Sequence, residues 1–184
     1  MRRSLLGSAL CVITLVTLLP PSPATLRAQN PPKKAPQAAM QKNKAVVKRY
    51  FEDLWNAKNS ATIAQISDPS IVFHFPGGPA AQPPDLATWF NSATEAFPDL
   101  RFTIHDLFAD GDHVIARWTY AATNTGKFLG RPPTGRKVSD EGISIFRIKD
   151  GKIVEMWISQ DSLGLLQQLG WVPTPASLPP GGKK

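Results

Sequence analysis

The sequence contains very little cysteine and histidine, and this scarcity excludes several kinds of site. Its 184 residues include one cysteine, Cys11, and three histidines. The histidines, His74, His105 and His113, show none of the close spacings that bind zinc. No glycine-rich phosphate loop is present either, since Gly77-Gly78 lies between prolines in a turn. The residues therefore predict no metal site and no nucleotide-binding loop.

The first 28 residues have the pattern of a secretion signal. Arg2 and Arg3 precede an apolar run, residues 5–19, which is short for a bilayer span. We expect cleavage after Ala28 and a secreted or periplasmic protein without stable membrane insertion; an uncleaved N-terminal anchor is the alternative. Cleavage would remove Cys11, so the mature protein would have no disulfide and no thiol nucleophile.

Basic residues outnumber acidic ones, 21 to 14, but the excess lies near the ends of the chain. Between residues 45 and 173, twelve Lys and Arg face all fourteen acids, which leaves a formal charge of −2. A nucleic-acid-binding surface is therefore not expected. Composition predicts a flexible Pro-, Ala- and Lys-rich linker over residues 29–43, one domain over 44–173 and a disordered tail over 174–184.

The patterns between the ends predict helices first and most strands afterwards. Helical spacing covers residues 45–56, 60–66 and 85–97; strand patterns cover 71–75, 101–108, 114–125, 138–148 and 152–160. Asp110-Gly111 and Asp150-Gly151 predict tight hairpin turns. This order indicates an α+β fold with an antiparallel sheet. A curved sheet wrapped around helices would leave a pocket at its mouth, suited to a small ligand.

The hairpin around Asp150-Gly151 carries the strongest candidates for chemistry. A two-residue turn would place Asp140 opposite Asp161. Alternation would put one set of side chains on the same face, namely Ile153, Glu155, Trp157, Ser159 and Asp161. The opposite face would carry an apolar stripe of Ile143, Ile145, Val154, Met156 and Ile158. We expect the Asp161 face to line the pocket, although Asp161 could instead serve only as the N-cap of a following helix.

Five segments of the chain together resemble the SnoaL-like polyketide cyclase, or ester cyclase, family of the NTF2-like superfamily. They are IVFHFPG with His74, FPDLRFTI from residue 97, DGDHVIARWTY from 110, TGKFLGRPPTGRKV from 125, and DGKIVEMW followed by QLG at 168–170. The resemblance implies a cone-shaped sheet wrapped around N-terminal helices, with a deep cavity. It also implies an intramolecular aldol ring closure of an aromatic polyketide that needs no cofactor or metal.

The resemblance assigns roles to particular residues. It gives Asp161 the position of the acid/base carboxylate and His74 that of a cavity histidine. Relatives commonly read Gly-Thr-His-x-Gly where this chain has residues 122–126 with Asn124, which can donate to a carbonyl but cannot shuttle a proton. Further substrate-binding candidates are Trp118, Phe146, Glu155, Trp157 and Arg117. Arg117 could equally form a salt bridge on the outer face.

Three functions fit these observations. The first is an exported enzyme that performs acid/base chemistry on a small apolar or aromatic carbonyl compound. The second is a non-catalytic periplasmic module that binds a small ligand, which Asn124 favours. The third is an assembly domain, whose cavity would be filled by Trp118, Phe146 and Trp157. The apolar stripe, if it lies on the convex side of the sheet, also predicts a homodimer.

Overall fold

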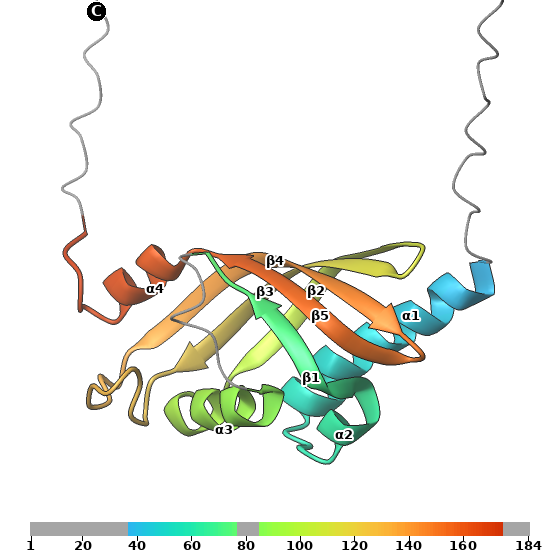
Figure 1. The fold of residues 1–184 in the computed structure, drawn as a ribbon. Helices are drawn as coiled ribbons and strands as arrows, with labels where there is room; N and C mark the ends of the chain where they lie inside the picture. Colours follow the sequence, from blue (N-terminus) through green and yellow to red (C-terminus); the bar gives the residue numbers. More distant parts are fainter. Residues whose placement is uncertain (1–36, 77–84, 175–184) are drawn as a thin grey trace, which may run out of the picture. The chain divides into compact units, whose positions relative to one another are not determined.

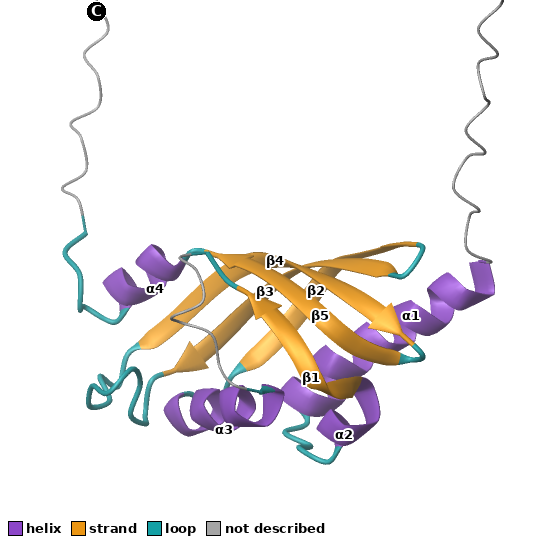
Figure 2. Cartoon of the chain, viewed as in Figure 1, coloured by secondary structure: helices purple, strands orange, loops and turns teal. Residues whose placement is uncertain are grey.

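A five-stranded sheet organises the described part of the chain, which is residues 37–76 and 85–174 of the computed structural model (Figures 1 and 2). The strands are β1 (Ser67–His74), β2 (Arg101–Asp110), β3 (His113–Thr123), β4 (Lys137–Lys149) and β5 (Lys152–Gln160), in the spatial order β1-β5-β4-β3-β2. Only β1 and β5 pair in parallel. The expected signal sequence, residues 29–36 of the linker and the tail from residue 175 lie outside the described residues.

Helices cover one side of this sheet. α1 (Gln37–Arg49) continues as the π-helix η1 (Tyr50–Asn56), and α2 (Thr62–Ile66) and α3 (Leu86–Ala96) follow. Figure 1 shows these helices on one side of the curved sheet, while α4 (Ser162–Gln168) follows β5 at its edge. None of the described helices is long and apolar enough to cross a membrane. The arrangement confirms the α+β prediction of a curved sheet around N-terminal helices.

The first helix begins earlier than the sequence pattern suggested. We expected a flexible linker up to residue 43, but α1 starts at Gln37 and already includes residues 37–43. These residues are mostly Ala, Gln, Met and Lys, which have high helix propensity. Residues 37–43 show no apolar stripe, so the sequence pattern does not predict a helix there. The buried side chains begin only at Val47 and continue into η1.

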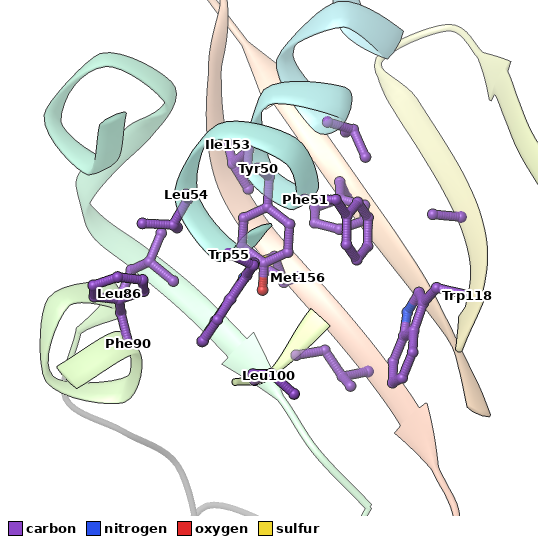
Figure 3. Close-up of a cluster of buried hydrophobic side chains, with 14 of the residues drawn as sticks. Tyr50, Phe51, Leu54, Trp55, Leu86, Phe90, Leu100, Trp118, Ile153 and Met156 are labelled. Atoms are coloured by element: carbon purple, nitrogen blue, oxygen red, sulfur yellow. The ribbon is translucent and has the colours of Figure 1, made fainter. Parts of the chain in front are cut away.

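The inner face of the sheet packs against η1 and α3 to form the core. One transverse row of inner-face residues runs from Val114 on β3 through Phe146 and Met156 to Phe73 on β1. The Tyr50 ring meets the Phe146 ring edge-on, with centroids 5.2 Å apart. Figure 3 shows the η1 side chains in this cluster above Met156. These contacts bury the three aromatic side chains of η1, which are Tyr50, Phe51 and Trp55.

The hairpin between β4 and β5 confirms the turn but corrects its register. Asp150 and Gly151 both have positive φ (51° and 77°), as a type I′ turn requires. Lys149 pairs with Lys152, but a bulge then shifts the ladder, so that Arg147 pairs with Glu155. A one-residue shift moves every later side chain to the opposite face.

The bulge overturns the predicted division of faces. Ile153, Met156 and Ile158 are buried on the inner face, whereas Glu155 and Trp157 lie on the outer face beside Ile145. The predicted apolar stripe is therefore divided between the two sides of the sheet. The prediction that the Glu155 and Trp157 face lines the interior is wrong for the same reason.

Candidate functional site

Asp140 is the one carboxyl group that the structure buries among the described residues. Its side chain lies on the inner face of β4 and is 8% exposed. One carboxyl oxygen accepts a hydrogen bond from the Glu141 amide at 2.8 Å, while the other, Oδ2, is buried without a partner among the described residues. Burial raises the pKa of Asp140; the backbone amides of Glu141 and Asp161 offset part of this rise, and the nearby carboxylates of Asp161 and Glu141 add to it. A carboxyl group in this state can hold or accept a proton nearer neutral pH than an ordinary aspartate.

Asp140 lies at the wall of a small pocket beyond the end of β5, where β4 is paired only with β3. This pocket, which we call the notch, has a volume of about 300 Å³ and is lined by Thr119, Ser139, Asp140, Glu141, Asp161 and Gln168. The Gln168 side chain bonds to the backbone N–H and C=O of Ser139, so α4 takes the place of the missing strand neighbour. Asp140 thus forms part of the wall of the notch, while its own Oδ2 remains buried.

A second pocket continues from the notch across the sheet. It has a volume of about 330 Å³, shares Glu141 and Asp161 with the notch, and adds Arg117 and Ile143. Arg117 is paired with Asp106, at 2.6 Å from Nη2 to the carboxylate. The predicted alternative of a salt bridge for Arg117 is thus confirmed, while its side chain still lines a pocket next to the candidate acid.

Asp161 lies at the notch, and its carboxylate is the N-cap of α4. Its carboxylate accepts a 2.8 Å hydrogen bond from the Gly164 amide and so caps α4. The pairing of β4 with β5 ends at Gly142 and Gln160, so Asp161 is not opposed to Asp140 in the ladder as predicted. The two carboxylates nevertheless line the same pocket, and the charge of Asp161 acts on Asp140.

Asn124 is fully buried and its amide group is occupied within the fold. Its Nδ2 donates to the carbonyls of Ala96 and Gly126, and its Oδ1 accepts from the Thr134 amide and hydroxyl. These bonds tie the loop between β3 and β4 to the end of α3. No donor of Asn124 is left for a substrate carbonyl, which corrects the role expected from the resemblance.

His74, Glu155 and Trp157 form a cluster on the outer face, away from the notch. The His74 ring nitrogen Nε2 lies 2.8 Å from Glu155, and its ring stacks on Trp157 with centroids 4.8 Å apart. Arg147 also contacts Glu155. These hydrogen bonds, that of His74 first, lower the pKa of Glu155. His74 and Asp161 line different pockets, so the structure does not bring the two predicted catalytic residues together.

Trp118 and Phe146 belong to the core. Phe146 is completely buried, and Trp118 is buried with its indole N–H donating to the Ser144 hydroxyl at 2.9 Å. Neither lines the notch. Of the residues predicted from the sequence to form the site, Asp161 and Arg117 therefore lie at connected pockets. Asp140 joins them at the notch, as an Asp at an inward-facing position of β4.

The chain belongs to the SnoaL-like polyketide cyclase family. The sequence profile of that family matches residues 45–169, which is most of the chain and contains both pockets. This match confirms the resemblance drawn from the five sequence segments.

Relatives in sequence and structure support the same assignment. The aklanonic acid methyl ester cyclase DnrD of Streptomyces peucetius is 41% identical over 68 residues, which are 36% of this chain and 46% of DnrD. The match thus spans about half the length of that relative. In structure, AclR from Streptomyces galilaeus, described as a putative hydroxylase, superposes with a TM-score of 0.65 at 30% identity, covering 75% of this chain and 91% of AclR. IdmH from Streptomyces antibioticus gives 0.58 at 31% identity, covering 70% and 98%.

Proposed function

We propose that this chain is an exported enzyme that performs acid/base chemistry, without a cofactor, on a small apolar carbonyl compound. The observation that carries the proposal is Asp140, a buried carboxyl group with an unpartnered oxygen at the wall of a pocket. Native proteins rarely leave a buried polar atom unpaired, and such atoms are often kept for catalysis or binding. The named activity of DnrD, a cyclase of a methyl ester, supports the choice of a carbonyl substrate.

The chemistry that suits this site is proton removal next to a carbonyl. The Asp140 carboxylate takes a proton from the carbon α to a carbonyl group, and an enolate forms. In a cyclisation, the enolate carbon attacks a second carbonyl of the same molecule, a carbon–carbon bond forms, and the resulting alkoxide takes the proton back from Asp140. A raised pKa suits both halves of this cycle, because the group must accept and then return the proton.

Asp140 suits the proton transfer better than Asp161 does. The Asp161 carboxylate is already bound to the Gly164 amide and is exposed to water, whereas Asp140 is buried. Asp161 contributes instead through its charge, which makes Asp140 harder to ionise. The adjoining pocket, with Gly142 and Ile143 in its wall, would hold the apolar remainder of the substrate.

Exchange of an α-proton tests the proposal without knowledge of the natural substrate. An aromatic β-keto methyl ester is incubated with the protein in D₂O, and deuterium uptake at the α carbon is followed by NMR. The wild type should speed up exchange over buffer. Asp140→Asn should lower the enzymatic rate by about 10²- to 10⁴-fold, while Asp161→Asn should lower it much less. Asp110→Asn, at the exposed end of β2, is the matched control and should leave the rate unchanged.

Each other outcome selects a different role. If Asp161→Asn loses the rate and Asp140→Asn keeps it, the acid/base group is Asp161, as the family resemblance suggests. If the wild type binds the ester with a change in tryptophan fluorescence but does not catalyse exchange, the chain is a ligand-binding module. Neither binding nor exchange by the wild type would contradict the proposal for this substrate class.

A further inference from the structure

The loop between β3 and β4 ends in a tight two-residue turn that carries an exposed leucine. Phe128 and Arg131 pair across this turn through backbone hydrogen bonds of 2.9 and 3.1 Å. Leu129 and Gly130, between them, both have positive φ (47° and 78°). Such a turn favours Asn or Asp before the glycine, and a leucine adopts positive φ only at a cost in free energy. Burial does not offset this cost, because Leu129 is 72% exposed. A strained and exposed leucine therefore points to a function outside the fold.

Aromatic contacts hold this turn in a fixed position. The Phe128 ring meets the Phe97 ring edge-on, with centroids 5.0 Å apart, and stacks on the Trp171 ring at 5.8 Å. The Arg131 guanidinium lies 5.1 Å from the centre of the same tryptophan ring. Beyond its chain neighbours, no atom of the described residues lies within 4 Å of a Cβ added at Gly130, so the turn ends in open space. We call residues 127–131 the tip; Figure 1 shows this loop at the same end of the sheet as α4.

The loop that carries the tip is strongly basic. Residues 124–137 contain no acid but four exposed basic residues, which are Lys127, Arg131, Arg136 and Lys137. None of the four forms a salt bridge within the described residues. Two acids, Glu95 and Asp99, lie near the base of the loop, where Asp99 accepts two hydrogen bonds from Thr123. The charge of this loop contrasts with the formal −2 of residues 45–173 as a whole.

An exposed apolar side chain flanked by cations fits the surface of a membrane that contains anionic lipids. The cations are attracted to the lipid phosphates, and the apolar side chain enters the boundary between headgroups and acyl chains. A protein partner fits less well, because a stable interface buries about 800 Å² on each partner. The tip offers one large exposed apolar side chain, Leu129, for such an interface.

We propose that the tip docks on an anionic membrane surface, with Leu129 inserted at the level of the headgroups and with Lys127 and Arg131 beside the lipid phosphates. Arg136 of the same loop donates to the Gln168 carbonyl, and Gln168 lines the notch. Docking therefore holds the notch close to a phase in which apolar compounds collect. The proposal does not rest on the acid/base chemistry of Asp140, because lipid binding is measured without a substrate.

Co-sedimentation with lipid vesicles tests the docking. The wild type, in the form isolated from the producing cell, is mixed with vesicles of phosphatidylglycerol and phosphatidylcholine, or of phosphatidylcholine alone. It should bind the mixed vesicles more tightly than the neutral ones. This affinity should fall by at least about tenfold between about 0.1 M and about 1 M salt, because the screening length shortens from about 10 Å to about 3 Å. Every variant has the same residues 1–36 as the wild type, so any contribution from them is common to all.

Leu129→Asn separates membrane contact from stability. Asn adopts positive φ more readily than Leu, so Tm should not fall, while the affinity for mixed vesicles should fall by about tenfold through the loss of apolar burial. Lys127→Gln combined with Arg131→Gln should lower the affinity by about 25-fold, about fivefold for each charge. The matched control is Lys42→Gln with Lys48→Gln on α1, which lies at the other end of the sheet in Figure 1 and should leave binding unchanged.

Three results would overturn the proposal. The first is a wild type that does not bind the mixed vesicles, or a Leu129→Asn variant that binds them equally well. The second is loss of binding in a Lys183→Ala, Lys184→Ala variant but not in the Lys127, Arg131 variant, which would assign the contact to the C-terminal tail. The third is full competition by a short DNA duplex that binds the wild type and Leu129→Asn equally, which would show a general polyanion-binding surface.

Discussion

Tyr120 faces Asp140 across β3 and β4, on the inner side of the sheet. Burial raises the pKa of the Tyr120 hydroxyl, and the negative charge of Asp140 raises it further. The hydroxyl therefore stays protonated in the same environment that makes Asp140 harder to ionise. Two groups that both favour their neutral forms lie side by side, at the end of the inner face nearest the notch.

Asp140 should make stability depend on pH. Its pKa is raised in the folded state, so the stability it contributes is fully present below the unfolded value of about 3.9 and is lost as the pH rises through the folded value. Asp140→Asn should therefore be more stable than the wild type at pH 7, by about 1 kcal/mol or about 2–4 °C in Tm. The difference should vanish near pH 3.5 in urea titrations. A gap that does not change with pH would show that ionisation of Asp140 is not its cause.

Asp161 should behave as a helix cap in stability measurements. Asn caps helices about as well as Asp, so Asp161→Asn should leave Tm nearly unchanged, whereas Asp161→Ala should cost about 1 kcal/mol. Gly164→Ala should cost at least as much, because its added Cβ would lie 2.2 Å from the Asp161 carboxylate. Thermal unfolding of the three variants checks this order. Equal losses for the Asn and Ala variants would show that the charge, and not the hydrogen bond, is what matters.

Export is tested at the N-terminus of the protein. Cleavage after Ala28 would leave every described residue in place, since α1 begins at Gln37. N-terminal sequencing of protein from the producing cell should return a chain that begins near Gln29. A chain that begins at Met1, or a lipid attached to Cys11, would contradict export as a soluble protein.

The sequence identified the turns and the fold well, because local chemistry determines them. Asp150-Gly151 needs positive φ at both positions, and few other residue pairs tolerate it. The bulge after Ile153 could not be predicted in the same way, since no Gly or Pro marks it in the run from Lys152 to Met156. That single inserted residue determines which side chains face the interior, and so the candidate site moved from Asp161 to Asp140.

Asn124 illustrates a second limit. Its type and position were compatible with a ligand-binding amide, and only the three-dimensional path of residues 124–136 shows that its amide is bonded to the carbonyls of Ala96 and Gly126 and to the amide and hydroxyl of Thr134. A short polar residue in a loop is ambiguous for this reason. One of its partners, Ala96, lies at the end of α3 and is distant in sequence, and sequence periodicity carries no information about such a contact.

The ring of Trp118 packs so closely on Gly142 that there is no room for a Cβ at this position. A substitution of Gly142 therefore tests the packing of the core. A Cβ at Gly142 would lie 2.5 Å and 2.6 Å from two carbons of that ring and 2.6 Å from the Ser159 carbonyl oxygen. Gly142→Ala should therefore destabilise the fold by about 1–3 kcal/mol through overpacking. In a double-mutant cycle, Trp118→Leu should relieve part of this cost, because the ring is removed while the Ser159 carbonyl remains. Urea unfolding of the four proteins measures the coupling. Strict additivity would show that the backbone contact, and not the indole, requires glycine at this position.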